Sequence, residues 1–501
     1  MCAQASPNRV GSDLLVRLDP EALQVLQATH IVHDGGHVIG VATGLITATE
    51  ADLIVRRLQV GADPGPSAPD CSWAAAARRP SREVAATAST MFSSGLFYCV
   101  ERSELVLGTD PGGVIRARET ATELCPDFVR AFALMNTAAS RTPYIGVERL
   151  PVGQTLLWHP GRPSQDRKVT WSGLVSWGEP KAAGPGIISE YRERFDSVVA
   201  DLLKRVGPAS IQVSGGLDST FVAGTVGQVL PHDADVLGMC YLPIPQAKLY
   251  ARGNWDPDDF PTAVLMAKRY PNLQIDRIIN ASRTEPLDAA ELARQRGWWP
   301  VFNPDNQVWL DQTLNRAARR GSHALLVGMN GNAAFSPDVT YGAKYHAGRA
   351  ELDRLFRASA VRADSGWSRR DRIRRHMLAP LAQAVRRDQP YSSSYLRAVG
   401  LAHMPTPAAH QGTFNRERHL RWLIGNDSAL QAAANPAATG GVLYADPFRA
   451  RQILDFAAQI QPVDWLRGPA PRGLARLIAA DRVPDAIRLR TRRGGQAWDT
   501  W

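Results

Sequence analysis

The chain has 501 residues, of which 44% are hydrophobic and 21% charged, a composition that indicates a globular protein with a large core and excludes a disordered or fibrous one. No run of about 18 apolar residues occurs, and Met1 to Arg17 lacks the apolar stretch of an export signal, so we expect a cytoplasmic protein without a membrane span. The 58 Lys and Arg against 48 Asp and Glu leave a net charge of +10, which favours anionic partners such as nucleotides, acidic peptides or RNA.

The amino-terminal part has the pattern of short strands separated by turns. Alternating apolar residues between Gly, Asp and Pro clusters predict strands at 30–32, 38–42, 95–100, 104–108, 147–150 and 154–158. The stretch from Ala62 to Arg82 is dense in Pro, Ala, Ser and Arg and is predicted to be an irregular loop. The segment from Gly178 to Gly186 interrupts all periodicity, which makes it the best candidate for a domain linker.

Beyond residue 187 the pattern changes to helices that alternate with short apolar strands. We expect helices at 188–205, 218–229, 258–270 and 306–320, and strands at 209–213, 236–241, 274–279 and 324–327. Such alternation implies crossover connections and a parallel sheet covered by helices on both faces. The remainder, from about Glu351, has a mostly helical pattern.

The most informative segment follows the predicted strand at 209–213. Two successive glycines, Gly215 and Gly216, allow a sharp turn whose amide groups can approach a polyanion, and the following helix directs its positive end into the same turn. Hydroxyl donors are available from Ser214, Ser219 and Thr220. Asp218 would repel a phosphate unless a divalent cation lies between them, so its presence suggests Mg²⁺.

The Ser-Gly-Gly-x-Asp-Ser turn resembles the pyrophosphate loop of the N-type ATP pyrophosphatases, which split ATP into AMP and pyrophosphate. A second loop, Gly328 to Ser336, follows the strand at 324–327. Together with the run 303–309 and the ending 490–499, these motifs resemble the asparagine synthetase superfamily, and within it most closely the bacterial lasso peptide cyclases. Those enzymes join a peptide's N-terminal amine to an internal Asp or Glu side chain.

This resemblance implies an α/β fold with two domains. Residues 187–501 would form a parallel-sheet ATP-pyrophosphatase (PP-loop) synthetase domain with a helical C-terminal extension, after a β-rich, degenerate glutaminase-like sandwich at 1–183. It implies ATP and Mg²⁺ as cofactors and a precursor peptide as substrate, with a leader peptidase and a leader-recognition protein as partners; nucleic acid is not expected.

The resemblance also assigns roles to individual residues. It places cofactor-binding groups at Ser214, Gly215, Gly216, Asp218, Ser219, Thr220, Met239, Gly328, Asn330 and Gly331. Metal ligands would be Asp218 and Asn332, catalytic groups Arg492, Arg493 and Asp218, and substrate contacts Asn306, Trp309 and Tyr345.

Some of these positions have a second interpretation or depart from the family pattern. Asn332 stands where relatives have a metal-binding Asp, and Arg492 where many have a catalytic Lys. Because an arginine stays protonated, Arg492 is expected to clamp phosphate or an oxyanion rather than move a proton; the alternative is an ordinary basic tail. Trp309 has the helical spacing of a core residue, and Asp446, followed by a proline, is predicted to cap a helix.

The amino-terminal part resembles the later strands of the family's glutaminase-like sandwich. In relatives that use glutamine the nucleophile is the cysteine exposed after Met removal, which makes Cys2 a candidate. The residues after it, Ala3 to Pro7, are neither glycine-bearing nor strand-like, and a thiol without oxyanion donors is not a catalyst. We therefore expect no glutaminase activity. The five cysteines form no Cys-x-x-Cys pair, which predicts reduced thiols rather than disulfides or a zinc site.

Three other functions remain open at this stage. The protein could amidate a small carboxylate, as asparagine or β-lactam synthetases do. It could be a tRNA-modifying pyrophosphatase, although the sequence has no catalytic thiol pair. It could also be a non-catalytic adapter that binds peptide or nucleotide, in which case replacing Asp218 would leave its function intact.

Overall fold

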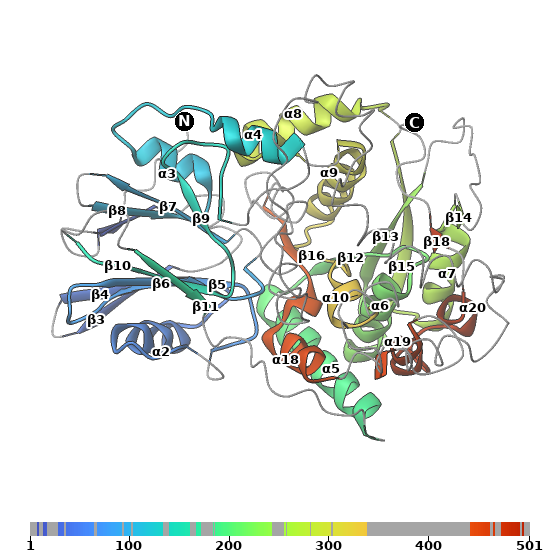
Figure 1. Cartoon of the computed structure of the whole chain (residues 1–501). Coiled ribbons are helices and arrows are strands. Elements are labelled where there is room, and N and C mark those ends of the chain that lie inside the picture. Colours follow the sequence, from blue (N-terminus) through green and yellow to red (C-terminus); the bar gives the residue numbers. More distant parts are fainter. Residues whose placement is uncertain are drawn as a thin grey trace, which may run out of the picture.

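The computed structural model describes residues 8–9, 14–17, 29–34, 37–64, 68–92, 95–101, 104–133, 140–160, 167–171, 184, 186–242, 255–256, 258–280, 282–301, 304–337, 441–460, 464–465, 472–490 and 493–494. Two regions are distinguished below by their sheets (Figure 1). The β-rich region comprises the described residues of 8–171, and the parallel-sheet region those of 187–494. The linker predicted at 178–186 lies largely outside the described residues, so the division into domains stays an interpretation of the sequence.

The β-rich region contains two sheets that lie face to face (Figure 1). The first has the order β1 (Asn8–Arg9), β2 (Leu14–Arg17), β8 (Glu104–Gly108), β7 (Leu96–Glu101), β9 (Glu148–Leu150). The second has the order β11 (Lys168–Trp171), β10 (Gln154–Trp158), β6 (Val84–Ala88), β5 (Trp73–Arg78), β4 (His37–Gly44), β3 (Thr29–Asp34). All neighbours in both sheets are antiparallel except β2 and β8. The predicted β-rich amino-terminal part is therefore confirmed.

Within the described residues, three helices accompany these sheets: α2 (Ala48–Gln59), α3 (Pro111–Ala117) and α4 (Pro126–Ala133). None of these helices was predicted from the sequence, although α2 carries a complete capping box between Thr47 and Glu50. Helix α2 lies against the second sheet so closely that a Cβ on Gly40 would be 2.5 Å from the Val55 side chain. The small side chains of the sheet let this helix approach.

The loop predicted from Ala62 to Arg82 is wrong, because β5 runs through it in the interior of the second sheet. Its sequence is Trp-Ala-Ala-Ala-Ala-Arg, and alanine is disfavoured in strands when judged alone. The neighbouring strand β6 presents alanines to it, with Ala74 opposite Ala88 and Ala76 opposite Ala86. Tertiary packing of small residues between a helix and a second sheet therefore overrides the local preference.

The parallel-sheet region is built on five parallel strands in the order β15 (Leu273–Ile279), β13 (Val236–Leu242), β12 (Ala209–Gln212), β16 (Ala324–Leu326), β17 (Leu443–Ala445). Its larger helices are α5 (Ile187–Val206), α6 (Leu217–Val229), α7 (Phe260–Arg269), α8 (Pro286–Gly297), α9 (Pro304–Arg319) and α18 (Arg451–Gln459). Shorter elements are α10 (Gly331–Ala334), the 3₁₀ helix η4 (Pro447–Arg449), α19 (Gly473–Ile478), α20 (Asp485–Arg488) and the paired strands β14 (Trp255–Asp256) and β18 (Arg493–Gly494). The predicted α/β fold with a parallel sheet is confirmed.

Helices cover both faces of this sheet, as alternate residues of its strands show. In β13, Val236 and Cys240 belong to the core shared with α5, α6 and α7, whereas Leu237 and Met239 pack with α9. This two-sided burial explains why the sequence of β13 is a continuous apolar run. Among the described residues, no helix is long and apolar enough to cross a bilayer, and the four described cysteines are free thiols.

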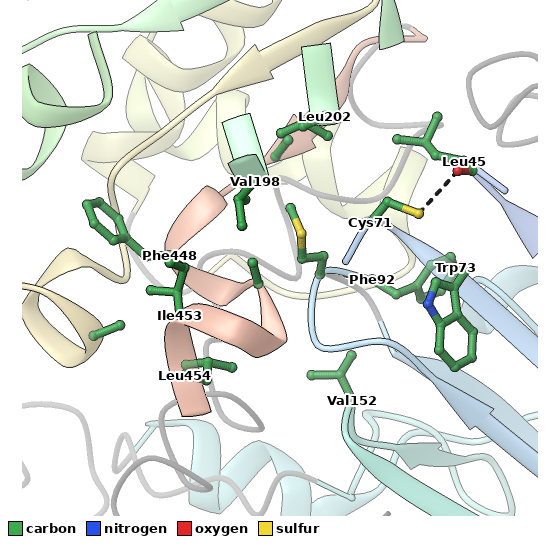
Figure 2. Close-up of a cluster of buried hydrophobic side chains, with 14 of the residues drawn as sticks. Leu45, Cys71, Trp73, Phe92, Val152, Val198, Leu202, Phe448, Ile453 and Leu454 are labelled. Carbon is green, nitrogen blue, oxygen red and sulfur yellow. Dashed lines mark hydrogen bonds between the residues drawn. The ribbon is translucent and has the colours of Figure 1, made fainter. Parts of the chain in front are cut away.

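The cores of the two regions are continuous. Leu45, Cys71, Trp73, Phe92 and Val152 of the β-rich region belong to the same buried cluster as Val198 and Leu202 of α5, Phe448 of η4, and Ile453 and Leu454 of α18 (Figure 2). The Cys71 Sγ–H donates to the Leu45 carbonyl at 3.1 Å. The two regions therefore bury apolar surface against each other rather than merely lying in one chain.

Candidate functional site

The first loop of the site joins β12 to α6 at the carboxyl edge of the parallel sheet. The Ser214 N–H donates to Ser219 Oγ at 3.0 Å, and the two hydroxyl oxygens are 2.8 Å apart. The Gly216 N–H donates to Ser214 Oγ at 3.1 Å. These bonds close a tight turn at the place where the sequence predicted one.

Helix α6 begins in this turn with Gly216 as its N-cap, which has no side chain to offer. The amide groups of the first turn are therefore not capped by their own N-cap residue and can donate to an anion. Thr220 is fully buried, and its hydroxyl donates back to the Gly216 carbonyl at 2.8 Å. The Thr220 hydroxyl thus bonds within the first turn of α6, whereas the hydroxyls of Ser214 and Ser219 stabilise the loop before it.

The second loop follows β16, the neighbour of β12, and lies directly on the first. A Cβ on Gly331 would be 2.5 Å from both Cβ and Cγ of Asp218, and one on Gly328 would be 2.9 Å from the Ser219 nitrogen. Contacts under 3.0 Å are sterically forbidden, so only glycine fits at these two positions without displacing its neighbours. The glycines of the second loop bring it against the start of α6.

Asp218 lies between the two loops. Its Oδ1 accepts a bond from Ser336 Oγ at 2.5 Å, and its Oδ2 is 3.6 Å from an Arg472 nitrogen. The same guanidinium donates to Asn332 Oδ1 at 2.8 Å. Burial raises the pKa of Asp218, while Arg472 and Ser336 partly oppose that rise. The two residues predicted as metal ligands therefore converge on one cationic group.

Asp446 holds the second loop through hydrogen bonds to Asn330. One carboxylate oxygen accepts the Asn330 N–H at 2.7 Å and the Asn330 side-chain amide at 3.0 Å, while the other accepts the Phe448 N–H at 3.1 Å. The predicted capping role is confirmed, because Asp446 is the N-cap of η4 with Pro447 at its first position. Burial raises the pKa of Asp446 to about 6. The bond to Asn330 was not anticipated from sequence.

A charged cluster closes the other side of the first loop. Arg490 donates to the Gly215 carbonyl at 3.1 Å, to Asp259 at 3.0 Å and to Asp256 at 2.5 Å. Burial raises the pKa of Asp259, and Arg490 lowers it. A Cβ on Gly215 would be 2.1 Å from Arg490 and 2.4 Å from Asp259, so this cluster sets the shape of the loop's outer side.

Further arginines gather beside these groups. Arg476 donates to the carbonyls of Arg488 and Arg490, and its pKa is lowered to about 10 by burial and by the charges of Arg472 and Arg488. Several arginine side chains therefore lie close to an uncapped helix start. Such an arrangement suits a polyanionic ligand.

The remaining predicted residues are less closely gathered. Met239 lies in β13, opposite Gln212, and its carbonyl accepts the Val213 N–H at 2.8 Å, so its backbone is beside the first loop. Trp309 is 8% exposed and packs in the α9 core near Tyr241, as its spacing suggested. Asn306 lies on the same helix and is half-buried.

Several predicted positions cannot be placed. Tyr345, Arg492 and Cys2 lie outside the described residues. Arg493 is described in its backbone, which pairs with Trp255 in the strand pair β14–β18.

Five contributors to the site among the described residues were not predicted: Arg472, Arg476, Arg490, Asp256 and Asp259. Arg490 stood at the start of a motif that was recognised, and Asp259 lies in a helix start that was predicted. No motif around Arg472 indicates its role, because its partner Asp218 lies 254 positions earlier in the sequence (472 − 218). Within the described residues, no group of three or more His, Cys, Asp or Glu side chains is placed to hold a metal ion.

The comparison with protein families decides the assignment. A family model described as asparagine synthase matches residues 190–501. The chain belongs to the asparagine synthase family. Membership of this family supports an ATP-dependent amide ligase, and the match contains both loops of the site.

Solved structures of other proteins are similar to parts of this asparagine synthase family member. An NMN synthetase from Francisella tularensis is 14% identical over 30% of this chain and 57% of its own, with a TM-score of 0.21. An NH3-dependent NAD synthetase from Campylobacter jejuni is 13% identical over 44% and 99%, with a TM-score of 0.21. A U34-tRNA thiolase from Methanococcus maripaludis is 11% identical over 49% and 76%, with a TM-score of 0.20. TM-scores this low give these likenesses no weight for function. No curated protein matches the chain in sequence.

Proposed function

We propose that this protein is an ATP- and Mg²⁺-dependent peptide macrolactam synthetase, that is, a lasso peptide cyclase. It adenylates an internal Asp or Glu side chain of a precursor peptide and joins it to the peptide's N-terminal amine, releasing AMP and pyrophosphate. A leader peptidase and a leader-recognition protein would supply the substrate. Family membership supports the ligase chemistry, and the peptide substrate rests on the motif resemblance.

The observation that carries the ligase chemistry is the meeting of two loops at the edge of the parallel sheet. The uncapped start of α6 and the turn at Ser214 face a second loop that only glycines allow so close. Amide groups fixed in this way can stabilise phosphate charge without reorganising, which is the main catalytic need in phosphoryl chemistry. Met239 would lie along adenine, and the turn along the β- and γ-phosphates.

The reaction needs two steps because a carboxylate is a poor electrophile. Its oxygen attacks the α-phosphorus of ATP, and pyrophosphate leaves. The amine then attacks the acyl carbon, loses a proton, and AMP leaves with the former carboxylate oxygen. Holding the two reacting ends of one peptide together removes most of the entropic barrier of the second step. Arg492 and Arg493 are proposed to clamp the phosphate or the developing oxyanion.

The residues at the site fit a magnesium ion. Asp218 Oδ2 and Asn332 Oδ1 both face the Arg472 guanidinium, which marks a position where two oxygens already meet a cation. Mg²⁺ commonly takes one or two protein oxygens and completes its shell with water and substrate phosphates. Asp218 and Asn332 would hold it, and it would neutralise charge on the leaving pyrophosphate.

The decisive experiment combines the purified protein with leader-free precursor peptide, ATP and Mg²⁺. Mass spectrometry should find a product lighter by one water, together with AMP and pyrophosphate. Formation of ADP would exclude the adenylate route. A response to free amino acids or small carboxylates in pyrophosphate exchange, with none to peptides, would instead identify an amide ligase for small substrates.

Asp218 separates a synthetase from a binding adapter. Asp218→Asn keeps the shape of the side chain but removes its charge, and should reduce product formation by about a hundredfold or more. Asp233→Asn, at an exposed turn, is the matched control and should match the wild type. An unaltered product yield in Asp218→Asn would contradict the proposed mechanism. If the wild-type protein binds peptide without turnover, and Asp218→Asn binds it with the same affinity, the adapter function is favoured.

A further inference from the structure

Helix α18 of the parallel-sheet region has no cap of its own. Its N-cap position is Ala450, whose side chain cannot accept a hydrogen bond. Asp70 of the β-rich region performs this task instead: its carboxylate accepts the Arg451 N–H at 2.8 Å and the Gln452 N–H at 3.3 Å. The Arg451 guanidinium also lies 3.8 Å from an Asp70 carboxylate oxygen. One region thus caps a helix of the other.

A second contact holds Arg449, the last residue of η4, which comes before the N-cap position of this helix. Thr90 Oγ1 donates to the Arg449 carbonyl at 2.6 Å, and Arg449 Nε donates to the Thr90 carbonyl at 2.8 Å. Both residues are buried, at 3% and 1% exposure. Side-chain and backbone groups therefore lock η4 to the β-rich region in both directions.

The segment held in this way, residues 446–452, begins with the carboxylate that fastens the second loop. Asp446 binds Asn330, and the next residue, Gly331, packs on Asp218 with no free space. Phe448, in the middle of the segment, contacts Phe221 of α6 and Phe335 of the second loop, with ring centroids 6.5 and 5.4 Å apart. Because Asp446 holds Asn330 and Gly331 leaves no free space beside Asp218, a shift of this segment should move the second loop against the start of α6.

From these contacts we propose that Asp70 and Thr90 are positioning residues of the nucleotide site, although they belong to the β-rich region. They fix residues 446–452, and this segment sets the distance between the second loop and Asp218. The inference rests on the proposed function, since it concerns how the ATP site keeps its shape. It gives a region without an evident active site a role in the chemistry of the other.

The test compares two kinds of contact between the same two regions: contacts that hold residues 446–452 and a contact that does not. Asp70→Ala and Thr90→Val remove the two holds on residues 446–452. Glu50→Gln is the matched control, because Glu50 accepts bonds from Arg205 of α5 at 2.8 and 3.0 Å across the same junction, and these bonds do not involve residues 446–452. For all variants, calorimetric titration with a non-hydrolysable ATP analogue and Mg²⁺ is combined with steady-state kinetics.

We expect Asp70→Ala to weaken nucleotide binding about fivefold and to raise KM for ATP similarly, the scale set by the loss of one helix cap. KM for the peptide should stay within about twofold, and Asp70→Asn, which keeps one acceptor oxygen, should restore part of the affinity. Thr90→Val, a milder change, should act in the same direction. Glu50→Gln should lower the melting temperature but leave nucleotide affinity unchanged.

Different results identify which statement fails. If Asp70→Ala and Thr90→Val lose stability yet bind nucleotide as the wild type does, or if Glu50→Gln weakens binding equally, the positioning role is wrong. If the wild-type protein binds no ATP, the proposed function is wrong, and this inference, which rests on it, is wrong as well.

Discussion

The two regions use close packing for different ends. In the β-rich region, Gly40 lets α2 lie on a sheet of alanines, and a Cβ there would be 2.5 Å from Val55 and 2.6 Å from the Ala76 carbonyl. In the parallel-sheet region, Gly331 lets one loop lie on another, with a Cβ clash of the same size against Asp218. The same steric requirement therefore supports a core in one case and a polar site in the other. Substitutions at these two glycines should have separable consequences.

The largest effect is expected from Gly331→Ala. The added methyl would displace Asp218 or the second loop, and a misplacement of this order can lower catalytic turnover by about a hundredfold. Pyrophosphate exchange and product formation measure the loss, while the unfolding free energy should change much less. Gly186→Ala is the control, since the nearest atom to its Cβ would be 4.0 Å away. Near-normal turnover in Gly331→Ala would show that the loops are not held as closely as described.

Gly40→Ala should show the reverse. Overpacking between α2 and the second sheet should lower the unfolding free energy by about 2 to 3 kcal/mol, measured by denaturant titration. Turnover at a temperature where the variant is folded should remain near the wild-type value. A loss of turnover without a loss of stability would erase the distinction between the regions.

The two regions also differ in how well the sequence predicts them. In the parallel-sheet region, each predicted strand and helix within the described residues is present within a few positions, because two-sided burial and helical periodicity leave strong patterns. In the β-rich region, strands β8 and β10 were predicted with their observed limits, yet β5, β6 and α2 were not. Alanine-rich strands such as β5 gain their stability from a helix and a second sheet, which no local pattern reveals.

The site divides in a similar way. Its two loops were predicted because each is a short motif that follows a predicted strand and combines glycine with serine and with aspartate or asparagine. Arg472, Arg490 and Asp70 were not, since each acts through a contact with a residue far away in the chain: Arg472 with Asp218, Arg490 with Gly215, and Asp70 with Arg451. These partners meet only in the folded chain, so composition and spacing do not predict the contacts between them.

Asp446 allows the junction to be tested by pH. Its pKa in the folded protein, about 6, exceeds the value of about 3.9 expected in the unfolded chain. The folded state therefore binds the proton more tightly, and the contribution of Asp446 to stability falls as pH rises between these values. Relative to Asp446→Asn, the wild type should lose about 2 kcal/mol of unfolding free energy from pH 4 to pH 7. A constant difference across this range would show that Asp446 is not desolvated as described.

The smallest effect is expected at the ion pair that joins α2 to α5. Glu50 and Arg205 are about one-quarter and one-fifth exposed, so Glu50→Gln should cost only about 1 kcal/mol of unfolding free energy. The Arg205 hydrogen bond lowers the pKa of Glu50, so the contribution is present above the unfolded-state value of about 4.3 and is lost as pH falls through the lower folded-state value. Asp52→Asn, which breaks an exposed pair within α2, should cost less at any pH. Equal losses in the two variants would mean that the junction gains nothing from this pair, and that its stability comes from the shared apolar core alone.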